Sequence, residues 1–215
     1  MGISIAKPMA PSVSTNLESI KLLVEHDEWT EIENCLIDSQ LLSKVHKLRI
    51  EDSKINNSTF TALDFDKLEI NNVVIQNSDL SALKTYQAVV QRSMLQNVRA
   101  TGSDFPEAEI KDCTFRDVKL DSAGFKLSTL KRVRFENCIL KNADFSMATL
   151  HDVTFAGCDL EGTYFDKVKF KSVDFRGENI LSIKGIVSMK GAIISSEQLY
   201  QVAPILASGI GFVVE

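Results

Sequence analysis

Several residue types are scarce in this 215-residue chain, which contains only 1 Trp, 3 Tyr and 4 Pro. Long apolar segments are missing too. No run approaches the ~18 residues that a membrane-spanning helix needs, and the stretch before residue 17 lacks the apolar core of a secretory signal. We therefore expect a cytoplasmic protein that does not bind a membrane. Hydrophobic residues make up 44% of the chain and charged residues 25%, a globular composition that excludes intrinsic disorder and collagen-like structure.

Recognisable arrangements of catalytic or metal-binding residues are missing as well. The 4 cysteines include no Cys-x-x-Cys pair, and none of the 3 histidines stands at a metal-ligand spacing from a cysteine. The sequence shows no phosphate-binding loop, no Ser/His/Asp grouping and no pair of catalytic carboxylates. We predict a protein without enzymatic activity, catalytic residues, cofactor or metal ion.

The abundant aromatic residue is phenylalanine, and its placement reveals an internal repeat. From residue 50 to residue 180, 25 of the 27 positions spaced by five are Phe, Leu, Ile or Val, and the exceptions are Thr85 and Ala100. Eleven of the 12 Phe lie in this series. A period of five matches neither a helix nor a continuous strand. It predicts a short extended segment followed by a turn, repeated along the chain.

A longer period is nested in this repeat, because every fourth segment is alike. Two sets of Phe recur in this way: Phe105, Phe125, Phe145 and Phe165, and Phe115, Phe135, Phe155 and Phe175. A third set contains residues that tolerate positive φ in a tight turn: Asn57, Asn77, Asn97, Asp117, Asn137, Gly157 and Gly177. Four segments per coil explain all three sets. We predict two Phe columns on opposite walls and one corner that adopts positive φ.

Individual segments match the A(D/N)LXX consensus of the pentapeptide-repeat family, for example residues 138–142 (CILKN), 143–147 (ADFSM) and 158–162 (CDLEG). The chain resembles this family over the whole of the repeat. The resemblance implies an all-β fold, a right-handed quadrilateral parallel β-helix over residues 46–182, with helical caps at its N- and C-terminal ends.

Three cysteines, Cys113, Cys138 and Cys158, fall at the small inward position of the repeat, two positions before a large residue. We interpret them as buried structural thiols. Cys138 and Cys158 are four segments apart and are expected to stack on adjacent coils. A disulfide between them is geometrically conceivable, but the cytoplasm disfavours one.

Residues 183–215 are predicted to cap the C-terminal end of the coil. Ser195 and Gln198 have the spacing of a capping box, so a helix is expected from about residue 196. Pro204 is expected to kink or interrupt that helix. The residues after it form a predicted short exposed strand, with Ile210, Phe212 and Val214 as the candidate dimer interface. This tail resembles the dimerisation element of several pentapeptide-repeat proteins, which implies a homodimer; the alternative is that Phe212 packs on its own cap.

Residues 1–45 are predicted to hold a disordered segment (1–15), a capping helix over residues 16–25 and the first irregular quintets. The helix is expected from the spacing of Leu17, Ile20, Leu23 and Val24, which suits a helix covering the first coil. Trp29, Ile32, Ile37 and Leu42 indicate early quintets in a shifted register. Joining them to the regular repeat requires a small insertion near residues 38–47.

The family resemblance also implies a function, because its quinolone-resistance members bind DNA gyrase as mimics of duplex DNA. The first hypothesis is therefore a DNA-mimicking modulator or protector of DNA gyrase or topoisomerase, with a role in antibiotic resistance. The alternative is a scaffold that binds an unknown protein partner and has no topoisomerase role. Direct binding of nucleic acid is not expected, because residues 46–180 have a net charge of −1 and residues 1–45 carry a net −4 of the total −5.

The most acidic wall of the predicted coil supplies the candidate partner-binding residues, which are Asp64, Asp66, Asp104, Glu107, Asp144 and Asp166. Lysines on the same wall dilute this charge. A small basic cluster, Lys131, Arg132 and Arg134, adjoins one corner and is the other candidate surface. A widened wall or short loop near residues 83–90 is a third hypothesis, because Thr85 is a weak core residue and the neighbouring Tyr86 points either outward or into the gap.

Overall fold

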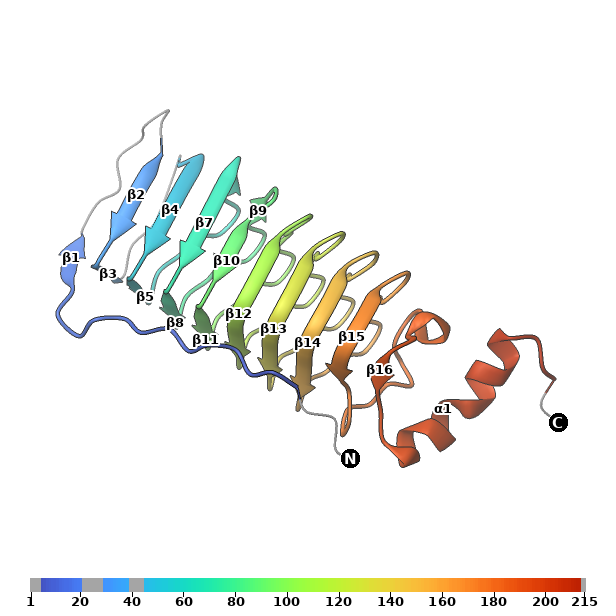
Figure 1. The fold of residues 1–215 in the computed structure, drawn as a ribbon. Helices are drawn as coiled ribbons and strands as arrows, with labels where there is room; N and C mark the ends of the chain where they lie inside the picture. Colours follow the sequence, from blue (N-terminus) through green and yellow to red (C-terminus); the bar gives the residue numbers. More distant parts are fainter. Residues whose placement is uncertain (1–4, 21–28, 39–44, 214–215) are drawn as a thin grey trace.

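The structure is a computed structural model that describes residues 5–20, 29–38 and 45–213. It shows a rod built mostly of short parallel strands that stack along one axis, with a single helix beyond its C-terminal end (Figure 1). In chain order the elements are β1 (Glu18–Ile20), β2 (Thr30–Glu33), β3 (Cys35–Asp38), β4 (Lys47–Glu51), β5 (Lys54–Asn56), β6 (Asp64–Phe65), β7 (Lys67–Asn71), β8 (Val74–Gln76), β9 (Lys84–Thr85), β10 (Val89–Gln91), β11 (Met94–Gln96), β12 (Glu109–Arg116), β13 (Thr129–Glu136), β14 (Thr149–Ala156), β15 (Lys169–Asp174), the 3-10 helix η1 (Ile186–Ser188), β16 (Ala192–Ile193) and α1 (Ser196–Gly209).

The strand pairing confirms that four segments make one regular coil. Ile70 pairs with Val90, and Val90 pairs with Ile110 one coil further along. Within one coil, four separate segments make such pairs, as shown by Thr59 with Asp79, Asp64 with Lys84, Glu69 with Val89 and Val74 with Met94. These segments are therefore hydrogen-bonded to the coils before and after them. The rod is a parallel β-solenoid in which each coil is stabilised by its neighbours.

The two Phe columns are present and fill the C-terminal half of the lumen. Phe105, Phe125, Phe145 and Phe165 stack at centroid distances of 5.6, 4.8 and 5.2 Å. The second column, Phe115, Phe135, Phe155 and Phe175, stacks at 4.9, 5.2 and 4.9 Å. The columns meet edge to face across the lumen, for example Phe135 with Phe145 at 6.1 Å. Offset stacking and edge-to-face contact are both favourable ring geometries, so the aromatic residues form one continuous core.

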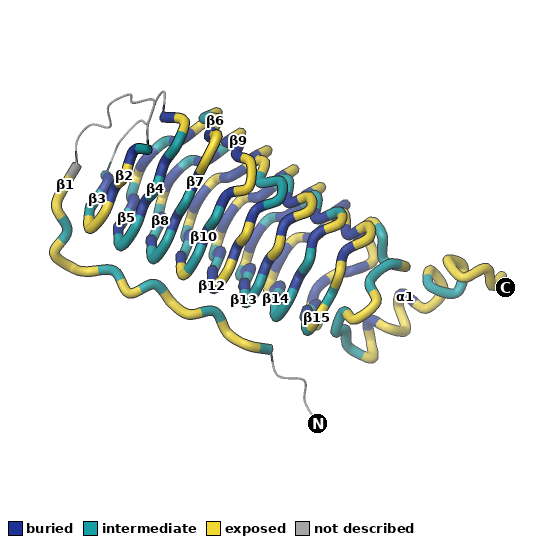
Figure 2. Tube along the Cα trace, turned by 45° about the horizontal axis from the view of Figure 1, so that its top comes forward, coloured by how far each residue is buried: buried dark blue, intermediate teal, exposed yellow. Residues whose placement is uncertain are grey.

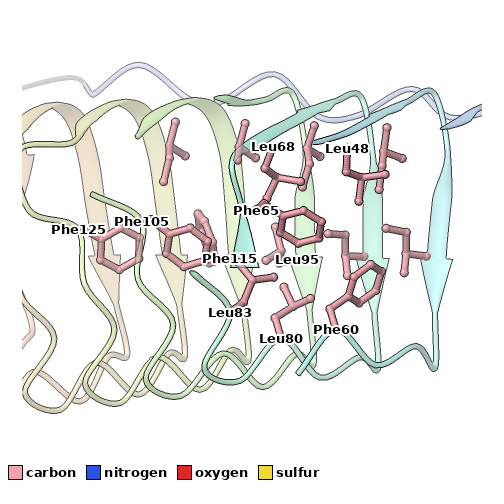
Figure 3. Close-up of a pocket in the computed structure, with 16 residues that line it drawn as sticks. Leu48, Phe60, Phe65, Leu68, Leu80, Leu83, Leu95, Phe105, Phe115 and Phe125 are labelled. Atoms are coloured by element: carbon pink, nitrogen blue, oxygen red, sulfur yellow. The ribbon is translucent and has the colours of Figure 1, made fainter. Parts of the chain in front are cut away.

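The N-terminal half of the lumen is filled less completely, because most of its inward residues are aliphatic (Figure 3). An apolar void of about 50 Å³ lies there, lined among others by Phe60, Phe65, Leu83 and Phe105. Thr85 replaces the Phe that would stand between Phe65 and Phe105 in the first column. Its buried Oγ1 has no hydrogen-bond partner in the described part of the chain. Packing density therefore falls where the Phe repeat lapses.

The corner residues adopt positive φ as predicted, and they do so at more corners than one. The expected column has φ of 49° at Asn57, 53° at Asp117 and 67° at Gly157. Positive φ also occurs in the other corner columns, at residues as unsuited to it as Ala62 and Leu127. Such residues cost roughly 1–2 kcal/mol each in this conformation. The hydrogen bonds to the neighbouring coils impose the same turn on whatever residue stands at a corner.

The C-terminal cap follows the prediction at its start and departs from it at its end. The Ser195 hydroxyl accepts a hydrogen bond from the Gln198 backbone amide, and the Gln198 side-chain carbonyl accepts one from the Ser195 backbone amide, which is the expected capping box. The helix α1 continues through Pro204 to residue 209. The predicted strand after it does not form in the described part, because Ile210 and Gly211 make a turn that directs the Phe212 amide to the Ala207 carbonyl at 2.9 Å.

Only part of α1 plugs the rod. Val202 is buried, and the buried Gln198 side chain donates to the main-chain carbonyls of Phe175 and Glu178 at 2.6 and 2.8 Å. Gln198 thus satisfies two main-chain acceptors just beyond β15, in place of the partners that a further coil would supply. Leu199 in the same helix is half exposed.

The predicted N-terminal helix over residues 16–25 is wrong where the structure describes it. Glu18–Ile20 forms the strand β1, which pairs in parallel with β3; residues 21–28 lie outside the described residues. An isolated helix this short has little intrinsic stability, whereas a strand here gains the main-chain hydrogen bonds of an otherwise open edge. The disorder predicted for residues 1–15 is also not what residues 5–15 show, because they run along the outside of the rod (Figure 2).

The early quintets exist, with Ile32 and Ile37 buried in β2 and β3; Leu42 lies outside the described residues. The expected insertion is wrong. Ile32 pairs with Ile50, which in turn pairs with Ile70, so the first step is two positions shorter than the second. Strand β3 pairs with β5 at the same short offset. This coil is therefore shorter than the regular ones.

Within the described residues, no helix has the length and apolar character to cross a membrane.

Candidate functional site

The predicted acidic residues lie on one wall of the rod, in columns that run from coil to coil. Asp64 is the backbone strand partner of Lys84, and Lys84 forms a backbone β-bridge with Asp104, so two aspartates and one lysine alternate in this column. Asp66 stands beside it and is exposed. The four residues Asp64, Asp66, Asp104 and Glu107 are therefore brought together on the N-terminal coils, as expected.

Tyr86 stands in the middle of this group and points outward. Its side chain is 50% exposed, and its hydroxyl donates to the Glu107 carboxylate at 3.0 Å. The side-chain amide of Gln87 donates to the other carboxylate oxygen of Glu107, also at 3.0 Å. The hydrogen bond to Glu107 raises the pKa of Tyr86, so the ring presents a neutral hydroxyl held in a fixed orientation.

Two further carboxylates, Glu69 and Glu109, join this group around the corner. They line a groove of about 740 Å³ together with Glu107, Gln87 and Leu127. Arg49 pairs with Glu69 at 2.8 Å, whereas no ion pair holds Glu109 in the described part of the chain. We call Asp64, Asp66, Glu69, Asp104, Glu107 and Glu109 the acidic patch. Sequence reasoning missed Glu69 and Glu109 because it summed charges wall by wall, and these two belong to the next wall.

The remaining two predicted residues are not part of the acidic patch. Asp144 lies two coils beyond Asp104, where it pairs with Lys126 at 3.1 Å and accepts from the Ser146 amide at 2.8 Å. Burial acts to raise the pKa of Asp144, but these hydrogen bonds and Lys126 outweigh it and lower the pKa. Asp166 lies 3.9 Å from Lys167. The wall is therefore polarised, with carboxylates in excess on the N-terminal coils and compensated on the C-terminal ones.

The loop considered near residues 83–90 does not exist. Lys84 and Thr85 form β9, which pairs with β6, and the backbone amide of Gln87 donates to the Pro106 carbonyl at 3.1 Å. The backbone ladder is continuous there, so the weak core at Thr85 does not produce a projection.

The predicted basic cluster is largely neutralised by its neighbours. Arg132 makes a bidentate pair with the buried Asp112, at 2.6 and 2.7 Å. Arg116 and Arg134 both contact Glu136, at 2.8 and 3.3 Å. These guanidinium groups hold the solenoid together and present little free positive charge.

The cysteines of the repeat are free and buried, as interpreted from the sequence. Burial raises the pKa of the Cys113 thiol to about 12, which keeps it protonated and unreactive at neutral pH. No group of three metal-ligating side chains is found among the residues that the structure describes.

The C-terminal end carries the large apolar side chains with the highest exposed fractions in the described part of the chain. Ile210 and Phe212, predicted for a dimer interface, are 75% and 67% exposed, and the adjoining Val213 and Tyr200 are exposed as well. Val214 lies outside the described residues. Phe212 does not pack on its own cap, which was the alternative to a dimer contact.

A family model of the pentapeptide repeat region matches residues 48–125 and 128–184, which is the stretch that forms the regular coils. The chain belongs to the pentapeptide-repeat family. Solved structures of other pentapeptide-repeat proteins resemble it. QnrB1, a plasmid-mediated fluoroquinolone resistance protein, is 19% identical, with 97% of this chain and 99% of that chain covered and a TM-score of 0.46.

Two other solved pentapeptide-repeat proteins are similar at the same low identity. HetL, involved in heterocyst differentiation regulation in the cyanobacterium Nostoc sp. strain PCC 7120, is 13% identical, with coverage of 80% and 92% and a TM-score of 0.46. A protein of the Arabidopsis thaliana thylakoid lumen is 20% identical, with 43% of this chain and 65% of that chain covered and a TM-score of 0.41. Comparison with curated proteins gives no match.

Proposed function

We propose that this pentapeptide-repeat protein is a non-enzymatic rod that binds a protein partner through the acidic patch. The observation that carries the proposal is the exposed Tyr86, which is hydrogen-bonded to Glu107, on the same N-terminal coils as the other carboxylates of the acidic patch. An exposed tyrosine framed by carboxylates suits a basic partner surface. The ring provides a rigid anchor, and the complementary charges steer association and fix its orientation.

The first partner we propose is DNA gyrase or a related topoisomerase. Enzymes that act on DNA have basic surfaces for its phosphates, and the quinolone-resistance members of the family bind gyrase. In this proposal the rod is right-handed and quadrilateral, lies in the cytoplasm, and its acidic patch takes the place of phosphates. A role in antibiotic resistance follows if the rod displaces DNA from a quinolone-poisoned complex.

A second candidate function is a scaffold that binds a different basic protein and does not act on topoisomerases. The polarised wall favours it. Mimicry of duplex DNA calls for negative charge along the rod, whereas Asp144 and Asp166 on the later coils are paired with Lys126 and Lys167. A short acidic patch needs only a partner with a basic surface of matching size.

Gyrase supercoiling and quinolone-stabilised cleavage, measured with purified protein, separate the two functions. The triple variant Asp64→Asn, Asp66→Asn, Glu107→Gln should lose the effect that the wild type has. The double variant Asp144→Asn, Asp166→Asn neutralises the other half of the same wall and should retain it. No effect of the wild type at micromolar concentration overturns the gyrase proposal, and equal loss in both variants overturns the assignment to the acidic patch.

We also propose that two copies join through the C-terminal end. Exposed side chains such as Phe212 and Ile210 are costly to leave in water at about 25 cal/mol per Å² of apolar surface, and a second copy would cover them. Light scattering should give the mass of a dimer for the wild type and of a monomer for Phe212→Asp. Leu181→Asp, an exposed apolar residue on the rod wall, serves as the control and should remain dimeric. An unchanged mass for Phe212→Asp overturns the proposal.

A further inference from the structure

The N-terminal segment lies along the outside of the rod, against a corner that the proposed function does not use (Figures 1 and 2). We call residues 5–13 the strap. The strap crosses the coils between Asp112 and Asn72, which occupy the same corner column two coils apart. This corner joins the walls centred on Ile70 and Ile75, whereas the acidic wall is centred on Phe65.

The contacts of the strap are made to its main chain. Asn72 accepts from the Ser12 amide at 2.6 Å and donates to the Ser12 carbonyl at 3.0 Å, so one side-chain amide pairs with both polar groups of one residue. Asp112 accepts from the Met9 amide at 3.4 Å. Because these bonds involve backbone groups, they recognise the conformation of an extended peptide more than its side chains.

The spacing of the strap matches that of the rod. Its half-buried residues are Ile5, Pro8, Pro11 and Val13, of which the first three stand at a period of three. Polyproline II has three residues per turn and a rise of about 3.1 Å per residue, so each turn advances roughly 9.3 Å. Two coils of a parallel solenoid advance roughly 9.6 Å at ~4.8 Å per strand. Amides one such turn apart, such as those of Met9 and Ser12, therefore meet acceptors on alternate coils.

The receiving side chains are held in place by other residues of the same column. Asp112 is fixed by the bidentate pair with Arg132, and burial leaves its side chain only 1% exposed. Asn72 donates to the Asp52 carboxylate as well as to the strap. A preorganised row of acceptors lowers the entropy cost of binding a peptide that is itself stiff.

From these observations we propose that this corner is a docking site for a Pro-x-x-Pro segment in the polyproline II conformation, carried by a partner protein. The strap occupies the site as a tethered competitor. Its own contacts are few and do not depend on sequence, so an external segment with prolines at the same spacing can make them equally well. Tethering raises the local concentration of the strap to the millimolar range, and the partner must overcome that competition.

The experiment uses the full-length protein and a fluorescent peptide with the sequence of residues 5–14, followed by anisotropy. The peptide should bind the variant Pro8→Gly, Pro11→Gly at least 10-fold more tightly than the wild type, because loss of the prolines weakens the competing strap and leaves the rod unchanged. A peptide of the same composition with adjacent prolines should bind weakly to both proteins.

Asn72→Gly, added to the strap variant, should abolish peptide binding. Glycine is compatible with the positive φ at this corner, so the coil is expected to fold. Asn57→Gly is the matched control, since Asn57 has a similar φ in a different corner column and should leave binding intact. Equal affinity for the wild type and the strap variant, or affinity that survives Asn72→Gly, overturns the proposal. A dimer that is lost in Asn72→Gly assigns the docking site to the strap of a second copy and overturns the external partner.

Discussion

Replacement of a stacked phenylalanine by leucine should cost far more stability than the same replacement outside the stacks. Phe145 is completely buried and contacts four rings. It stacks on Phe125 and Phe165 at 4.8 and 5.2 Å, and it meets Phe135 and Phe155 edge to face at 6.1 and 6.2 Å. Phe60 is also buried, but no aromatic ring packs against it within the described residues.

The size of the difference follows from the ring contacts. A hydrophobic exchange that nearly conserves volume costs less than about 1.5 kcal/mol, and we expect that for Phe60→Leu. Each aromatic pair adds about 0.5–1.5 kcal/mol beyond the buried area. Four pairs that share one ring are not fully additive. We therefore expect Phe145→Leu to destabilise the protein by about 2–4 kcal/mol more than Phe60→Leu.

Guanidinium unfolding combined with native-state hydrogen exchange measures this difference coil by coil, because the stability of a solenoid is close to a sum of nearest-neighbour terms. Phe145→Leu should lower the hydrogen-exchange protection of backbone amides most in the two neighbouring coils, which contain Leu127 and Asp166. Equal losses for the two variants would refute the reasoning, since burial alone would then account for the core and the ring geometry would contribute nothing.

Three further predictions concern the buried hydroxyl of Thr85, the C-terminal end of the rod and the buried thiol of Cys113. Thr85→Val should raise stability by about 1 kcal/mol in a thermal melt, because it removes a buried hydroxyl without a hydrogen-bond partner in the described part of the chain; a lower Tm contradicts the assignment, and Ser122→Ala at an exposed corner is the control. Gln198→Ala should cost about 1–3 kcal/mol and expose the last coil to hydrogen exchange, because two carbonyls lose their donor, whereas Gln201→Ala on exposed α1 surface should have little effect. The pKa of Cys113 is raised to about 12 in the folded state, above its unfolded value near 9, so the folded state disfavours the thiolate. The free energy of unfolding that the neutral thiol contributes is therefore present below pH 9 and is lost as the pH rises from 9 towards 12. Cys113→Ala should make the free energy of unfolding, measured with urea, fall less steeply over this pH range. An unchanged dependence on pH in the variant rejects the idea.

Much of the solenoid could be predicted because its signal is local and repeated. A large apolar residue such as Phe125 or Leu130 stands at the same position of nearly every five-residue segment, so each segment independently indicates which side chain points inward. The corner at Asn97 was equally readable, since few residue types tolerate positive φ. The prediction erred at Leu17 and Ile20, whose spacing suits a helix but whose position beside β3 offers strand pairing. A tertiary partner there outweighs a weak local preference.

The candidate site was only half visible in the sequence. Asp64 and Asp66 belong to one wall by simple counting, and the structure keeps them together. Glu109 joins them around a corner, and Asp144 leaves the group because Lys126 lies within 3.1 Å of it. Which charges remain free depends on side-chain pairing across coils.

The sequence by itself determined the repeat and the inward residues, because a five-residue period can bury its large side chains only by coiling. Tertiary structure alone decided what happens where the period stops. The strap, with Pro8 and Pro11, does not follow the five-residue repeat of the rod, and it is located by Asn72 and Asp112, which lie far along the chain from the strap residues that they contact. Contacts of that separation depend on the coils being stacked first, so they cannot be read from any local pattern.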